Sequence, residues 1–117
     1  MTDLQTRTKK YSLRIIRLCQ SLPNDYVSRR IGDQLLRSGM SVGANYRAAC
    51  RARTPAEFIA KLGIVEEEAD ETLFWMELLI ESGIMDAQAL SLLQQEANEI
   101  PAMVVASIKT TKRKMKR

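Results

Sequence analysis

The stretch of residues 35–53, LLRSGMSVGANYRAACRAR, constrains the fold more than any other part of the chain. At about 100° per residue, the apolar side chains in and just before it fall into one arc, with glycines along its edge. The members of this arc are Ile31, Gly32, Leu35, Gly39, Val42, Gly43, Tyr46, Ala49 and Cys50. Glycines on a packed helix face let a neighbouring backbone come close, which has to offset about 1 kcal/mol of lost helix propensity at each. The pattern predicts the second half of a long helix with a buried face.

The opposite side of this helix is cationic. Five arginines fall within an arc of roughly 100°, and they are Arg29, Arg30, Arg37, Arg47 and Arg51. This face is the one functional indication that composition and spacing supply, and it does not define an activity.

Helical spacing of apolar residues also occurs on both sides of this stretch. The first helix is expected over residues 3–21, because Pro23 lacks the amide donor that a continuing helix would use. Asn24 or Asp25 can cap the second helix, which is expected over residues 26–52. A helix of that length, roughly 40 Å at 1.5 Å per residue, is typical of a long bundle.

The third and fourth helices have clear start and stop signals. Thr54 is the expected N-cap of the third helix, with Pro55 at its first position and Glu57 completing a capping box. Gly83 fits the end of that helix and Asp86 the cap of the next. The stripes expected in the core from the first, third and fourth helices comprise Leu4, Tyr11, Ile15, Leu18, Cys19, Leu22, Phe58, Leu62, Val65, Ala69, Leu73, Met76, Leu79, Ile80, Leu90, Leu93, Ala97, Ile100, Val104 and Ile108.

The size and composition of the chain favour one all-α domain. With 117 residues, five glycines, three prolines and six aromatic residues, the chain has little material for the turns and packed strands of a β fold. We expect a single domain over residues 1–110, in which Pro101 bends the last helix without ending it. Residues 111–117 should form a basic tail, frayed because residues 109–117, KTTKRKMKR, lack apolar groups to fix them to a core.

Charge is segregated along the chain. Residues 1–53 contain eleven basic and three acidic residues. Residues 54–108 contain one basic and eleven acidic residues, and residues 109–117 contain six basic residues and no acidic one. Two interpretations are open: basic helices dock beside an acidic one, or cationic surface is left over for an anionic partner.

The end of the third helix is apolar on most sides. In the segment LFWMELLI, residues 73–80, three side chains lie outside the expected core stripe, namely Phe74, Trp75 and Leu78. Large apolar residues beyond the core face favour a subunit interface anchored by Trp75. Alternatively, Trp75 covers the end of a monomeric bundle.

Several kinds of chemistry are not expected. The chain has no histidine, so the glutamates of the third helix lack the Glu-x-x-His partners of a bundle-core metal site. Cys19 and Cys50 have apolar neighbours and no paired spacing, which favours buried free thiols. Neither a phosphate-binding glycine loop nor a nucleophile beside a base is present, so we expect no enzyme and no cofactor. Without a signal sequence or an apolar run of bilayer length, a cytoplasmic protein with no membrane contact is expected.

Residues 37–49, RSGMSVGANYRAA, also carry a family resemblance, together with Phe58, Leu62, the glutamates at 66–68 and Trp75. This pattern resembles the bacterial four-helix-bundle proteins encoded within intervening sequences of large-subunit ribosomal RNA genes. The accessory variability determinant of diversity-generating retroelements looks like a relative.

The resemblance implies an up-down-up-down antiparallel four-helix bundle, assembled into a ring that is typically a pentamer with a basic surface. The retroelement relative binds nucleic acid and a reverse transcriptase through such a surface. Arg37, Asn45, Arg47 and Arg51 align with the shared stretch. We interpret Ser38, Ser41 and Asn45 as structural, because such side chains readily bond to nearby backbone.

The resulting hypothesis is a non-enzymatic homo-oligomer associated with RNA or DNA through phosphate contacts of low base specificity. Its candidate nucleic-acid-binding residues are Arg14, Arg17, Arg30, Arg37, Arg47 and Arg51. The alternative is an adaptor or scaffold whose basic face binds an acidic protein partner.

Overall fold

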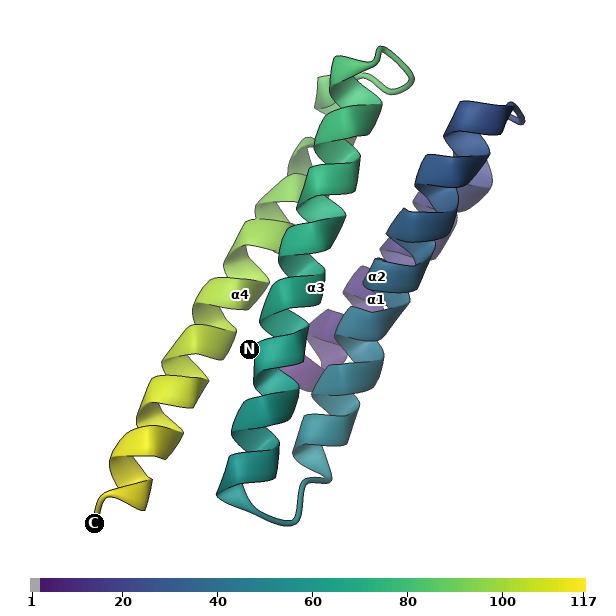
Figure 1. Cartoon of the computed structure of the whole chain (residues 1–117). Helices are drawn as coiled ribbons and strands as arrows, with labels where there is room; N and C mark the ends of the chain where they lie inside the picture. The colour runs from purple at the N-terminus through teal and green to yellow at the C-terminus, as the bar shows by residue number, and fades with distance from the viewer. Residues whose placement is uncertain (1–2) are drawn as a thin grey trace.

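The structure, a computed structural model, describes residues 3–117, and these residues form four long helices (Figure 1). The helices are α1 (Leu4–Ser21), α2 (Tyr26–Cys50), α3 (Pro55–Glu81) and α4 (Ala87–Met115). Successive helices run in opposite directions and short loops join them, which gives a rod of 53 × 22 × 22 Å. The predicted all-α, up-down-up-down bundle is confirmed. The first two residues of the expected domain, 1–110, lie outside the described residues.

The starts of α2 and α3 follow the predicted capping signals, whereas Asp86, at the predicted cap position of α4, makes no side-chain capping bond within residues 3–117. The Asp25 carboxylate accepts a hydrogen bond from the backbone N–H of Ser28 at 2.9 Å, and the Thr54 hydroxyl accepts one from the backbone N–H of Glu57 at 3.0 Å. The Glu57 carboxylate accepts from the backbone N–H of Arg53, at 3.4 Å, where a capping box would use the cap residue itself. Local sequence therefore decides where α2 and α3 begin.

Helix α4 differs from its prediction at its end. It continues through Pro101 and reaches Met115, so the segment expected to be frayed is helical in the structure. Lys112, Arg113 and Lys114 occupy its last turn, where positive charge interacts favourably with the negative end of the helix dipole. The absence of apolar anchors in residues 109–117 therefore did not predict the end of this helix.

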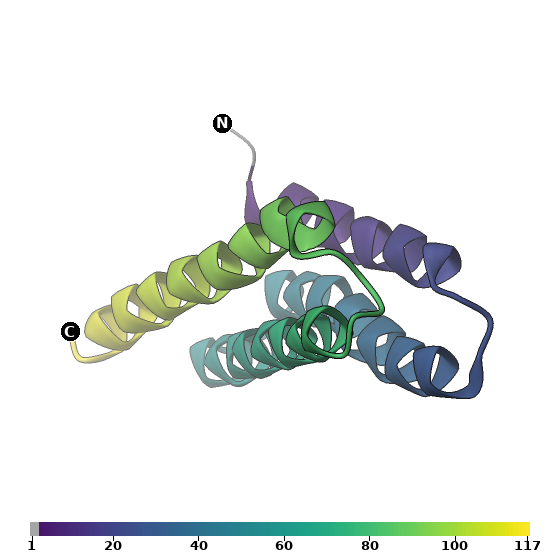
Figure 2. The same ribbon diagram turned by 90° about the horizontal axis from the view of Figure 1, so that it is seen from above.

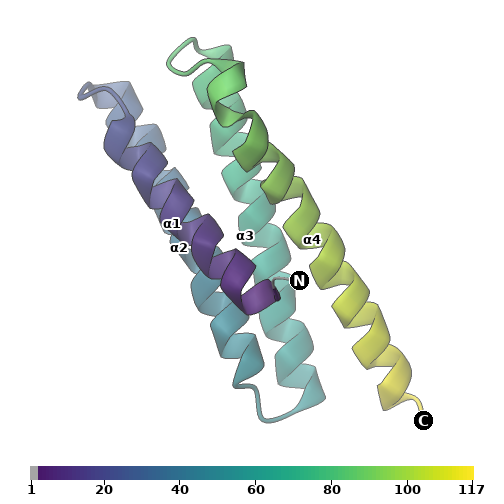
Figure 3. The ribbon, with the colours of Figure 1, turned by 180° about the vertical axis from the view of Figure 1, so that it is seen from behind.

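The four helices form two layers, and the first helix is shorter than the other three. Figure 2 shows α1 and α4 on one side and α2 and α3 on the other. Helix α1 has 18 residues against 25, 27 and 29 in α2, α3 and α4, and it begins part-way along the rod (Figure 3). The end of the bundle that holds the α2–α3 loop and the end of α4 therefore has no α1 beside it.

The core follows the predicted stripes closely. Its buried apolar side chains come from all four helices and are Tyr11, Ile15, Leu18, Leu35, Val42, Ala49, Leu62, Val65, Ala69, Met76, Leu79, Leu90, Leu93, Ala97, Ile100 and Val104. One polar contact crosses it, a 2.6 Å hydrogen bond between the hydroxyls of Tyr11 and Thr72. The prediction for the cysteines was wrong in part, because Cys50 is exposed and Cys19 is only half-buried. The helical arc placed Cys50 inward, but it lies at the end of α2, beyond the reach of α1.

The glycines of α2 form the predicted close-packing seam against α1. A Cβ atom at Gly39 would lie 2.4 Å from Ile15 Cγ2, and one at Gly43 would lie 2.6 Å from Ser12 Oγ. The Ser12 hydroxyl donates to the Gly39 carbonyl oxygen at 2.7 Å and accepts from the Gly43 N–H at 3.1 Å. The backbone of α2 is thus reached directly by a side chain of α1, which any larger residue would prevent.

Candidate nucleic-acid interface

The predicted cationic side of α2 is exposed along its whole length. All five arginines of the predicted arc are exposed to solvent, so the helical periodicity placed this face correctly. Their partners differ from one end of α2 to the other, and those partners determine which guanidinium groups are available to a phosphate.

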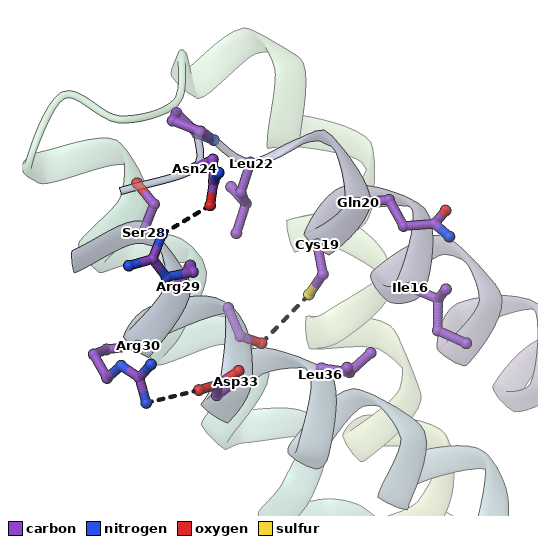
Figure 4. A pocket seen from close by; sticks show the side chains of 12 residues that line it. Ile16, Cys19, Gln20, Leu22, Asn24, Ser28, Arg29, Arg30, Asp33 and Leu36 are labelled. Atoms are coloured by element: carbon purple, nitrogen blue, oxygen red, sulfur yellow. Dashed lines mark hydrogen bonds and ion pairs between the residues drawn. The ribbon is translucent and has the colours of Figure 1, made fainter. Parts of the chain in front are cut away.

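At the start of α2, Arg29 and Arg30 border a hollow of about 450 Å³ between α1 and α2 (Figure 4). The Arg29 guanidinium donates to the Asn24 side-chain oxygen at 2.8 Å. The Arg30 guanidinium lies 3.2 Å from the Asp33 carboxylate and 5.3 Å from the ring centre of Tyr26. Both arginines already have partners within the chain.

Arg37 faces α3 and is paired there. Its guanidinium forms ion pairs with Glu71 and, at 3.2 Å, with Glu68. The Glu71 carboxylate also accepts a hydrogen bond from the Trp75 indole N–H at 3.0 Å. On the opposite flank of the bundle, Arg7 pairs with Glu96 and, at 2.9 Å, with Glu99 of α4. The hydrogen bond that Arg7 donates to the Glu96 carboxylate raises the pKa of Arg7. Docking of basic helices beside acidic ones is thus confirmed for these two arginines.

Arg47 and Arg51, near the end of α2, are different. Within residues 3–117, neither forms an ion pair. Arg47 lines a groove of about 380 Å³ between α1 and α2, with Lys9 on the α1 side and Ser12 and Gly43 among its other lining residues. Lys9 was not predicted as a contact residue from the sequence. The one indication that could have pointed to it was its position in the basic first helix.

Arg14 and Arg17 lie elsewhere. They line a shallow hollow of about 350 Å³ between α1 and the start of α4, beside Leu18, Leu90 and Leu93. Arg14 is half-buried and Arg17 exposed. The six predicted contact residues therefore do not form one patch: four lie along α2 and two on the flank between α1 and α4.

The polar residues of the shared stretch have local partners. The Ser38 hydroxyl donates to the Gln34 carbonyl oxygen at 2.9 Å. The Asn45 side-chain amide donates to the Ser41 carbonyl oxygen at 2.9 Å and to its hydroxyl at 2.7 Å. All of these bonds lie within α2, in agreement with the structural interpretation of Ser38, Ser41 and Asn45.

The apolar residues expected at a subunit interface divide into two groups. Phe74 is 49% exposed, and its ring lies edge-on to that of Trp75 with 5.1 Å between centres. Leu78 is half-buried. Trp75 is also half-buried and packs against the core, and its place at a subunit interface stays a prediction.

Comparison with known proteins identifies the family of this chain. A profile of the family described as 23S rRNA-intervening sequence protein matches residues 2–106. The chain belongs to this family. It is similar to a crystal structure, at 1.70 Å resolution, of a protein with unknown function from the S23 ribosomal protein family of Bacteroides thetaiotaomicron VPI-5482. That similarity has 34% sequence identity and a TM-score of 0.84, and it covers 92% of this chain and 99% of the other.

Comparison with curated proteins gave no match. The family resemblance of the sequence is thus confirmed, while the relation to the retroelement determinant stays a prediction. No helix within residues 3–117 has an apolar stretch able to span a membrane. No group of three or more His, Cys, Asp or Glu side chains in that part of the chain could hold a metal ion.

Proposed function

We propose that this four-helix protein associates with nucleic acid through phosphate contacts, without an enzymatic role. The observation that carries the proposal is the state of Arg47 and Arg51, which are exposed and form no ion pair within the described residues. No acidic residue occurs between Asp33 and Glu57, so no acid on the neighbouring turns of α2 offsets the charge of these arginines. Guanidinium groups of this kind bind phosphate well and read little base sequence.

The second part of the proposal is a homo-oligomer in the cytoplasm, with the ring of five that the family resemblance implies. Phe74 supports an interface on the outer side of α3, because it is large, apolar and half exposed. A symmetric assembly would repeat each arginine cluster several times, which strengthens weak contacts to a long polyanion.

Fluorescence anisotropy of a labelled duplex tests the first part. Each phosphate neutralised releases condensed counterions, so the logarithm of the association constant should fall linearly with the logarithm of salt concentration, by about 0.9 per contact. Absence of binding at low salt, or binding indifferent to salt, would contradict the proposal.

A protein adaptor is the competing function. A pull-down from lysate with and without nuclease separates the two. Partners that disappear after nuclease treatment support nucleic-acid association, whereas a protein partner that survives digestion supports the adaptor.

A further inference from the structure

The fold brings together two basic segments that lie far apart in the sequence. Helix α3 spans roughly 40 Å and the antiparallel α4 roughly 43 Å at 1.5 Å per residue, so the end of α4 lies level with the start of α3. The start of α3 is in turn joined to the end of α2 by a short loop. The α2–α3 loop and the C-terminus accordingly occupy the same end of the rod in Figures 1 and 3.

This end of the molecule is strongly cationic. We call it the basic pole and define it by nine exposed residues: Arg47, Arg51, Arg53, Lys109, Lys112, Arg113, Lys114, Lys116 and Arg117. Residues 47–60 and 102–117 contain one acid, Glu57. None of the nine forms an ion pair within residues 3–117.

The helix dipole accounts for only part of this charge. Cations stabilise a helix C-terminus within its last turn, a position that Lys112, Arg113 and Lys114 occupy. Arg53 lies beside the start of α3, where the dipole is positive and disfavours a cation. Outside the nine residues of the pole, the sequence has fourteen acids and nine bases, so the charge of the molecule is separated along its length.

Resting on the proposed function, we infer that the basic pole is where nucleic acid docks, and that it binds the sugar-phosphate backbone of a double helix. Single-strand binders rely on aromatic side chains that stack on bases. The aromatic residues nearest the pole, Tyr46 and Phe58, are half-buried and pack against the core. Long cationic side chains on a surface about 22 Å across suit the regularly spaced phosphates of a duplex instead.

Two charge-matched double variants of the full chain test this inference. The pole variant is R51Q/K112Q, which removes one cation from each basic segment. The control is K10Q/R29Q, two exposed cations outside the pole, outside the six predicted contact residues and outside every ion pair of residues 3–117. Each variant loses the same charge, and circular dichroism at 222 nm checks that the helices are intact.

The probe is a fluorescein-labelled DNA duplex of about 20 base pairs, compared with an RNA duplex and with the single strand of the same sequence. The pole variant should reduce the salt slope by about one per side chain removed, and the control should leave it nearly unchanged. Tighter binding of either duplex than of the single strand is expected.

Equal losses in both variants would show that net charge alone matters and would overturn the docking site. Equal or tighter binding of the single strand would overturn the duplex assignment. Failure of the unmodified protein to bind any of the three probes would instead contradict the proposed function itself, so the two failures are distinguishable.

Discussion

Gly39 and Gly63 show how much a glycine depends on its surroundings. Gly39 lies against Ile15 with no room for a Cβ atom, whereas a Cβ at Gly63 would meet no heavy atom within 4 Å. We expect G39A to lower the free energy of unfolding by about 1–3 kcal/mol through overpacking. G63A should raise it by up to about 1 kcal/mol, because alanine is the better helix former. Urea denaturation measures both, and equal effects at the two sites would contradict the seam.

The two thiols should differ in reactivity. Burial raises the pKa of Cys19 to about 11, and its thiol donates to the Gly32 carbonyl oxygen at 3.5 Å. Cys50 is exposed. Because the thiolate is the reactive form, alkylation at pH 8 should modify Cys50 first and Cys19 slowly, and C50S should remove the fast phase. Labelling at equal rates in the native protein would contradict this assignment.

At the scale of single helices, the N-cap of α2 predicts a pH dependence. Hydrogen bonding from the backbone N–H of Ser28 lowers the pKa of Asp25 below its ordinary 3.8. The ionised carboxylate therefore stabilises the folded state above the unfolded-state pKa, and this contribution is lost as pH falls through the folded-state pKa.

In D25N the cap accepts the same bond without titrating. The difference in unfolding midpoint between the native protein and D25N should therefore shift in favour of D25N as pH falls from about 6 to about 3. A difference that does not change with pH would show that the Asp25 charge contributes nothing.

These elements also show what the sequence could predict. Capping at Thr54 and Asp25 depends on residues three apart, so the starts of α2 and α3 were predictable from local chemistry. The exposure of Cys50 was not, because it depends on where α1 begins along the rod. The end of α4 was not either, because its last turn is helical without apolar anchors. The exposed arginine face followed from helical period alone, but the ion pairs that occupy Arg37 required the position of α3.

For the whole molecule, the outer side of α3 carries the prediction on assembly. F74A should lower the mass measured by light scattering after size exclusion, with helicity retained, because Phe74 is 49% exposed and outside the core. L92A is the control, since Leu92 is 70% exposed on α4. A monomeric native protein, or an unchanged mass in F74A, would remove this interface.

The distribution of charge along the rod was the feature hardest to predict from the sequence. Along the chain, basic residues 1–53 and 109–117 are separated by an acidic middle. In the fold, the end of the first segment and the whole of the second meet at the basic pole, because four antiparallel helices return the chain to the same end twice. The position of the basic pole is therefore determined by the topology of the bundle.

Cys50 gives the most direct test of the account, because it is exposed and lies between Arg47 and Arg51. Its alkylation rate is measured in C19S with and without a saturating DNA duplex at low salt. Docking at the basic pole predicts a rate lowered at least severalfold by the duplex and restored at high salt, where phosphate contacts weaken. An unchanged alkylation rate while anisotropy reports a saturated complex would contradict it.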